Sequence, residues 1–145
     1  MARLLSSDNR VVKSETMTAP MPTIAKRISP MLATDDMNRT KYFYERVLGF
    51  KPVLDSPNYL VLERDGQTIH FQNAASEEVM RAMRKHGEFY LEVSGINALW
   101  EHVKTLRDEY KISDLCDREY GMTEFHIIDP NGVLVFVGEP TSRRG

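Results

Sequence analysis

The chain has 145 residues, of which 41% are hydrophobic and 28% charged, as in a soluble globular domain with an apolar core. Its formal net charge of −2 provides no basic field that would hold nucleic acid or an anionic membrane surface. No apolar run approaches the roughly 20 residues that a membrane-spanning helix needs. The single cysteine, Cys116, excludes a disulfide within the chain and favours a reducing, cytoplasmic location.

The first 22 residues show no sustained periodicity. They contain several serines and threonines and end in the turn-forming Pro20-Met21-Pro22. We therefore expect residues 1–22 to be a flexible leader. Residues 23–140 are expected to form a single domain, and residues 141–145 a short tail.

A strand is predicted near the start of the domain, where Ile28, Pro30 and Leu32 alternate with their neighbours. Proline has no backbone N–H to give to a sheet, so Pro30 indicates an edge position. A helix is predicted to follow, because Asp35 or Asp36 can act as its N-terminal cap.

This helix is followed by three short strands. The helical spacing of apolar residues ends at Gly49, since glycine accepts the positive φ of a helix end. Strands are predicted over residues 50–54, 58–63 and 68–72. The pair Asp65-Gly66 lies between the last two and predicts a tight hairpin turn.

The second half repeats this order after a polar linker. Residues 73–87 form the linker, and residues 77–85 within it can form a short helix. A further helix begins at Ile96, with Asn97 or Ser94 as its cap. The strands predicted in this half span residues 89–93, 112–118, 122–128 and 133–137.

The internal repeat predicts an α+β fold of two βαβββ modules, one over residues 24–72 and the other over residues 88–138. Each module alone is too small to bury its sheet. The two modules must therefore pair, either within the chain or across a dimer.

Three blocks of sequence match the pattern of a known superfamily. They lie at residues 34–50, 89–93 and 120–132, and the last reads YGMTEFHIIDPNG. Together they resemble the vicinal-oxygen-chelate superfamily, which includes glyoxalase I, extradiol dioxygenases, fosfomycin-resistance proteins and bleomycin-binding proteins. The last block is most similar to the bleomycin-resistance-like branch. The resemblance implies two curved mixed sheets around a concave cavity, and a homodimer.

Strand side chains alternate between faces, so one face of each sheet packs on helices and the other lines the cavity. The apolar, core-forming face is predicted to hold Ile28, Leu32, Ile69, Phe71, Phe89, Leu91, Val93, Phe125, Ile127, Val133, Val135 and Val137.

The opposite face carries polar and aromatic side chains that suit a planar or amphiphilic small molecule. The residues predicted to contact such a ligand are Met31, Tyr59, His70, Gln72, Glu88, Tyr90, Tyr120, Met122, Glu124, His126 and Phe136. For His70, the alternative is a hydrogen-bonded strand histidine with no role in binding.

The metal site of the superfamily is predicted to be broken in this chain. The resemblance places the metal-ligand positions at Ser29, His70, Glu88 and Phe136. Serine is a weak neutral ligand and phenylalanine cannot ligate, whereas a catalytic divalent site usually has about three protein ligands. No metal or other cofactor is therefore expected. The weaker alternative is an unorthodox site of His70, Glu88 and either Glu124 or His126.

Three functions remain open from the sequence. The first is a small-molecule-binding protein, such as one that sequesters an antibiotic of the bleomycin type. The second is a metal-dependent lyase, isomerase or dioxygenase of the same superfamily, which would use a divalent ion as electrophile. The third is a non-catalytic structural or regulatory partner. Because the ligand positions at Ser29 and Phe136 are missing, we favour the binding protein.

Overall fold

The computed structural model describes residues 19 and 21–143. The prediction of a flexible leader lies almost entirely outside the described residues, as does the end of the predicted tail. The strands are β1 (Met31–Thr34), β2 (Lys51–Asp55), β3 (Tyr59–Arg64), β4 (Gln67–Asn73), β5 (Glu88–Glu92), β6 (Lys111–Ile112), β7 (Cys116–Asp117), β8 (Met122–Ile128) and β9 (Leu134–Pro140). The α-helices are α1 (Met37–Leu48), α2 (Glu77–His86) and α3 (Ile96–Val103), and the short 3₁₀ helices are η2 (Lys104–Leu106) and η3 (Thr141–Arg143).

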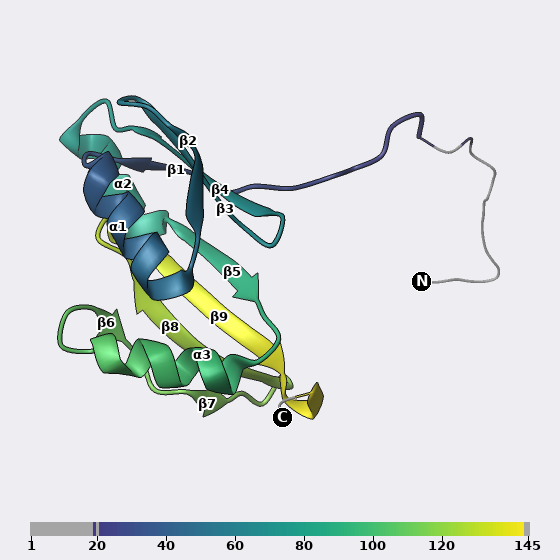
Figure 1. The fold of residues 1–145 in the computed structure, drawn as a ribbon. Helices are drawn as coiled ribbons and strands as arrows, with labels where there is room; N and C mark the ends of the chain where they lie inside the picture. Colours follow the sequence, from purple (N-terminus) through teal and green to yellow (C-terminus); the bar gives the residue numbers. More distant parts are fainter. Residues whose placement is uncertain (1–18, 20, 144–145) are drawn as a thin grey trace.

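The strands form two sheets (Figure 1). Sheet A has the order β1-β4-β3-β2, and sheet B has the order β5-β9-β8-β6, with β7 also paired to β8. In each module the first strand runs parallel to the last, β1 to β4 and β5 to β9, and the other pairs are antiparallel. The predicted α+β fold of two βαβββ modules with mixed sheets is confirmed. Among the described residues, no helix has the length and apolar composition to cross a membrane.

The first strand begins later than predicted. It starts at Met31, and the Ile28 side chain is 91% exposed, so the prediction that Ile28 belongs to the core is wrong. The register of β1 and β4, continued backward from Met31 and His70, places Ile28 opposite Gln67, the first residue of β4. The chain before Met31 passes the β3–β4 turn, where Arg27 Nε donates to the Gly66 carbonyl at 2.8 Å. At this end of the sheet Ile28 lines an open apolar cleft with Phe89 and Leu91 and is not packed into the core.

Helix α1 has the predicted ends. Asp36 is the N-terminal cap, and its side chain accepts a hydrogen bond from Arg39 N at 3.0 Å. Gly49 ends the helix with φ of 75°. The hairpin turn is also confirmed, since Asp65 and Gly66 both have positive φ, 51° and 82°.

Helix α3 is capped from a distant strand, so the prediction of a cap at Asn97 or Ser94 is wrong. Its N-terminal cap is Gly95, which has no side chain to accept a hydrogen bond. The buried carboxylate of Glu139 on β9 accepts hydrogen bonds from Gly95 N at 3.3 Å and Ile96 N at 3.0 Å instead. The first free N–H groups of this helix thus find a partner more than 40 residues away in sequence.

The single strand predicted over residues 112–118 is two short strands, β6 and β7, both antiparallel to β8. Ile112 pairs with Ile127, whereas Cys116 pairs with Glu124, so this side of the ladder contains one extra residue, as in a β-bulge. The Ser113 hydroxyl takes the place of a backbone acceptor there and receives a hydrogen bond from His126 N at 2.9 Å.

Both sheets direct their apolar faces into one core. Side chains of sheet A, sheet B, α1 and α3 belong to a single buried cluster, in which Phe71 and Phe125 are fully buried. The predicted core face is confirmed apart from Ile28, although the side chains of Phe89, Leu91 and Val93 are only partly buried against the cluster. The opposite faces of the two sheets are therefore directed away from this core.

A buried polar joint holds module one against module two. In it, Tyr44 on α1 donates a hydrogen bond to Asp129 Oδ2 at 2.7 Å. Thr34 Oγ1 donates to Asn131 Oδ1 at 2.7 Å, and Asn131 Nδ2 donates to Thr40 Oγ1 at 2.9 Å. The turn at residues 129–132, predicted only as a connection between strands, is thus part of the contact between modules.

Candidate functional site

The predicted ligand residues fall into two groups on the outward faces of the two sheets. Face A is the outward face of sheet A, and it holds Met31, Leu54, Tyr59, Val61, His70 and Gln72. Face B is the outward face of sheet B with its rim, and it holds Glu88, Tyr90, Met122, Glu124, His126, Ile128, Leu134, Phe136 and, from the β7–β8 turn, Arg118 and Tyr120.

Face A carries an apolar row around one histidine. Leu54, Val61, His70 and Met31 are neighbours across four strands. The Tyr59 hydroxyl and His70 Nδ1 are 2.8 Å apart, with the two rings edge to face at 5.6 Å. His70 therefore has a hydrogen-bond partner. Elsewhere in the apolar row, Met31 and Leu54 are 57% and 49% exposed.

Two residues of face A, Leu54 and Val61, were not among the predicted ligand residues. For Leu54, the register of β2 shifts between Pro52 and Leu54, which breaks the alternation on which the prediction depended. Val61 shares the face of Tyr59 through the unbroken alternation of β3, so it was detectable from the sequence. Pro52 inside the strand was the available signal, because proline in a strand often marks a bulge.

Face B is built around three rings on adjacent strands. Tyr90, Phe136 and His126 lie opposite one another on β5, β9 and β8. The Tyr90 and Phe136 rings are nearly parallel, with 21° between their planes and 6.1 Å between their centroids. The His126 ring lies 4.4 Å from that of Phe136. Leu134 and the partly exposed Ile128 extend this apolar surface toward Glu88.

A fully buried carboxylate closes one end of face B. Glu124 Oε2 accepts a hydrogen bond from the Tyr90 hydroxyl at 2.7 Å, and Glu124 Oε1 accepts one from the Tyr120 hydroxyl at 2.6 Å. The guanidinium of Arg118 lies beside the same carboxylate, with Nε 3.5 Å from Oε1. His126 Nε2 is 3.9 Å from Oε1 and 3.3 Å from Arg118 Nη2.

These contacts set the charges at this end of the face. Burial favours the neutral form of Glu124, but the hydrogen bonds from Tyr120 and Tyr90 and the charge of Arg118 outweigh it and lower the pKa of the carboxyl. Burial and the Glu124 carboxylate raise the pKa of Tyr90 well above its usual value, and the hydrogen bond to Glu124 raises the pKa of Tyr120. Both phenols therefore stay protonated as donors to an ionised carboxylate at neutral pH.

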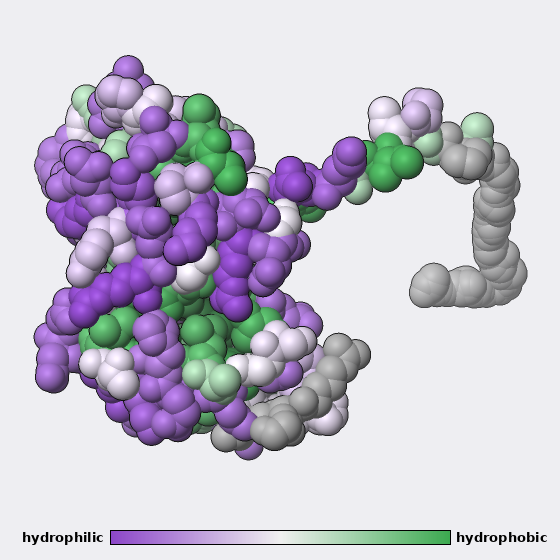
Figure 2. All heavy atoms as spheres, viewed as in Figure 1, coloured by the Kyte–Doolittle hydropathy of each residue, from purple (hydrophilic) through white to green (hydrophobic). Residues whose placement is uncertain are grey.

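Within the chain, faces A and B do not line one shared hollow. An apolar cleft of about 500 Å³ lies between the edges of β1 and β5, with Phe50, Phe89 and Leu91 among its lining residues. Of the eleven predicted ligand residues, only Tyr90 lines it. Figure 2 shows apolar side chains between the upper part of the molecule, which contains sheet A, and the lower part, which contains sheet B.

Within one chain, the described side chains do not form a divalent metal site. Across residues 19 and 21–143, no three histidine, cysteine or acidic side chains gather closely enough to hold an ion. The hydrogen bond between His70 Nδ1 and Tyr59 leaves Nε2 as the one ring nitrogen for an ion, and both oxygens of Glu124 accept hydrogen bonds from tyrosine hydroxyls. The Phe136 ring lies between Tyr90 and His126, at a position where the resemblance places a metal ligand.

Comparison with family models identifies the larger group to which the fold belongs. The model of the Glyoxalase/Bleomycin resistance protein/Dioxygenase superfamily matches residues 26–137, which is most of the chain. The chain belongs to this superfamily. A search among curated proteins found no match.

Solved structures of the superfamily share this fold at low sequence identity. A bleomycin resistance determinant encoded on transposon Tn5 is 20% identical, covers 80% of this chain and 98% of its own, and gives a TM-score of 0.65. A bleomycin-binding protein from Streptomyces verticillus, complexed with copper(II)-bleomycin, is 19% identical with 81% and 97% coverage and a TM-score of 0.66. A glyoxalase-related enzyme from Clostridium phytofermentans is 18% identical with 83% and 99% coverage and a TM-score of 0.62.

Proposed function

We propose that this protein binds a small amphiphilic molecule with a planar aromatic part on face B, and does so without a catalytic metal. The observation that carries the proposal is the ring row of Tyr90, Phe136 and His126, in which an aromatic ring stands at a metal-ligand position of the superfamily. Stacked aromatic side chains recognise flat apolar groups through area and geometry. Glu88, exposed at the other end of β5, would favour a cationic group on the ligand.

Drug sequestration is the form of binding that we favour. Structural neighbours include a bleomycin-binding protein complexed with bleomycin, at 20% identity and a TM-score of 0.64. Bleomycin is therefore the first probe to use, and the proposal extends to other flat, cationic antibiotics.

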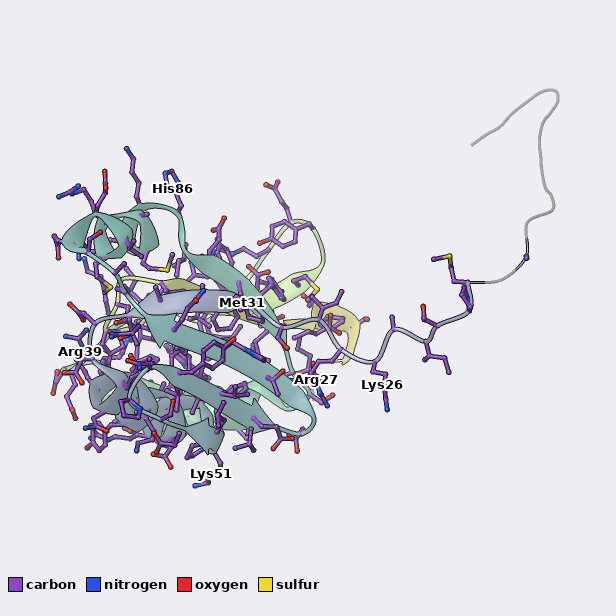
Figure 3. All side chains as sticks on the ribbon, turned by 90° about the horizontal axis from the view of Figure 1, so that it is seen from above. Lys26, Arg27, Met31, Arg39, Lys51 and His86 are labelled. Atoms are coloured by element: carbon purple, nitrogen blue, oxygen red, sulfur yellow. The ribbon has the colours of Figure 1, made fainter. Side chains whose placement is uncertain are left out.

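We expect a second copy of the chain to complete the site, so that the protein acts as a cytoplasmic homodimer. Face A leaves Met31 and Leu54 largely exposed, and face B leaves Tyr90 and Tyr120 exposed. The arm, residues 21–29, projects from sheet A beyond Met31, with Lys26 and Arg27 along it (Figure 3). Its Ile24 side chain is 86% exposed. Exposed apolar surface of this kind marks an interaction site, and face A of a partner would cover face B.

The ligand proposal predicts a loss of affinity when the central ring is removed. Phe136→Ala is expected to weaken bleomycin binding at least about tenfold, because one ring contact and its area are lost. Isothermal titration calorimetry measures this, with Tyr42→Ala as the control, since Tyr42 is an exposed aromatic residue on α1, outside face B. Absence of binding by the unchanged protein would exclude bleomycin, and unchanged affinity of Phe136→Ala would exclude face B.

The dimer proposal predicts that a change on face A abolishes binding on face B. Met31→Glu places a charge in the expected interface, so light scattering should give the mass of one 16.7 kDa chain instead of two, with bleomycin binding lost. A monomeric unchanged protein would contradict the dimer. A stoichiometric divalent ion that is lost in His70→Ala would overturn the proposed function in favour of a metal-dependent enzyme.

A further inference from the structure

Glu124 was predicted to contact the ligand, but its carboxylate faces other side chains. It is fully buried, and its two oxygens accept hydrogen bonds from Tyr90 and Tyr120. Arg118 lies alongside and balances its charge. A carboxylate with both oxygens occupied and no exposed surface cannot recognise a ligand directly, and it acts only through the groups that it holds.

Gly138 provides the space through which Tyr90 reaches Glu124. Gly138 lies on β9 directly opposite Glu124 on β8. A Cβ atom at this position would lie 2.0 Å from the Tyr90 hydroxyl oxygen, 2.9 Å from Tyr90 Cζ and 3.0 Å from Glu124 Cγ. These distances are shorter than van der Waals contact, so any larger residue would displace the Tyr90 hydroxyl. Gly138 does not have positive φ, so glycine is required here for space.

The β7–β8 turn is fastened to the same carboxylate. The turn is closed by hydrogen bonds from Arg118 N to the Met122 carbonyl at 2.7 Å and from Gly121 N to the Arg118 carbonyl at 3.0 Å. Tyr120 extends from it with 63% of its side chain exposed, yet its hydroxyl reaches Glu124. One carboxylate thus holds a ring on β5 and the turn that forms the rim of face B.

We propose that Glu124 is a positioning residue that fixes the Tyr90 ring parallel to Phe136 and secures the Tyr120 turn, and that Gly138 makes this arrangement possible. The proposal rests on the proposed function, in which the rings of Tyr90 and Phe136 bind the flat part of the ligand. A ring that is already held in place loses less conformational freedom on binding, so the ligand binds more tightly. Tyr90 is then the residue that contacts the ligand, and Glu124 acts through it.

Three variants test this arrangement by different routes. Tyr90→Phe keeps the ring and removes the hydroxyl, Glu124→Gln keeps the shape and removes the charge, and Gly138→Ala blocks the path between them. Each is expected to weaken bleomycin binding about tenfold, as for loss of one hydrogen bond to a charged group. The double variant Tyr90→Phe with Glu124→Gln should bind no more weakly than Glu124→Gln alone, because the hydrogen bond that Tyr90→Phe removes is already lost in Glu124→Gln. Tyr42→Phe, which loses an exposed hydroxyl on α1 outside both faces, is the matched control.

A second measurement works without any ligand. In protein carrying ¹³C-labelled tyrosine, the Tyr90 ring signal should shift in Gly138→Ala and in Glu124→Gln, and the Tyr120 signal should shift in Glu124→Gln only. If the Tyr90 signal stays unchanged in Gly138→Ala, or if additive losses of affinity appear in the double variant, the positioning role is overturned. If the unchanged protein does not bind bleomycin, that ligand fails, whereas the tyrosine spectra still decide the role of Glu124.

Discussion

Replacing Asp129 by alanine is expected to lower the free energy of unfolding by about 4 kcal/mol, because several buried donors lose their acceptor at once. Asp129 is only 3% exposed and accepts hydrogen bonds from the Tyr44 hydroxyl at 2.7 Å, from Asn131 N at 2.8 Å and from Val133 N at 2.9 Å. Water cannot readily replace the lost carboxylate in a joint between two modules that share one core. Urea denaturation followed by circular dichroism measures the loss.

Asp129→Asn is the matched control, since the amide keeps one oxygen for the backbone donors. Asp129→Asn should lower the free energy of unfolding clearly less than Asp129→Ala, and equal losses would contradict the account of unsatisfied donors.

Comparison with Asp129→Asn also predicts how the stability of the native protein depends on pH. Burial raises the pKa of Asp129 above its ordinary value of 3.8. This carboxyl therefore contributes its full stabilisation of the folded state below pH 3.8, the ordinary pKa. That contribution is lost as the pH rises through the raised pKa of the folded protein. As the pH rises through this interval, the native protein should lose stability relative to Asp129→Asn.

Replacing Gly132 by alanine is expected to cost about 3 kcal/mol, as the sum of an unfavourable positive φ and a steric overlap. Gly132 has φ of 88°, and a Cβ atom there would lie 2.4 Å from Arg84 Cγ and 2.9 Å from Arg84 Cα. The second atom belongs to the backbone of α2, so the helix itself would have to move. Thermal unfolding of the variant measures the effect.

Gly66 and Gly121 separate the two contributions. Both have positive φ, 82° and 89°, but an added Cβ would meet no atom within 4 Å at either position. Alanine at these positions should therefore cost only the backbone part, about 1–2 kcal/mol. If Gly132→Ala proves no more damaging than Gly66→Ala, the close packing of α2 on the turn does not contribute to stability.

Features set by neighbouring residues were predictable from the sequence. The cap at Asp36, the helix end at Gly49 and the Asp65-Gly66 turn all follow from local backbone chemistry. The core face of the strands followed from alternation alone, because most strands here keep a strict period of two.

Features set by distant residues were not predictable. The cap of α3 comes from Glu139, 43 residues after Ile96, and the partner of Tyr90 is Glu124, 34 residues later. Nothing local distinguishes Glu124 from an exposed glutamate, and its burial depends on how β5, β8 and the β7–β8 turn meet. Ile28 was wrongly placed in the core, because its alternation with Leu32 continues past Met31, the first residue of β1, to an exposed position.

The geometry around Gly138 also predicts which residues should occur together in homologues. A methyl group at position 138 and a tyrosine hydroxyl from position 90 would occupy the same volume. The residues at these two positions should therefore change together in evolution. In homologues, tyrosine at the position of Tyr90 and glutamate at that of Glu124 should accompany glycine at that of Gly138. Lineages that have replaced this glycine should have a phenylalanine or a smaller residue instead of the tyrosine. Such linked substitutions would show which homologues kept the paired rings of face B and which homologues bind other ligands.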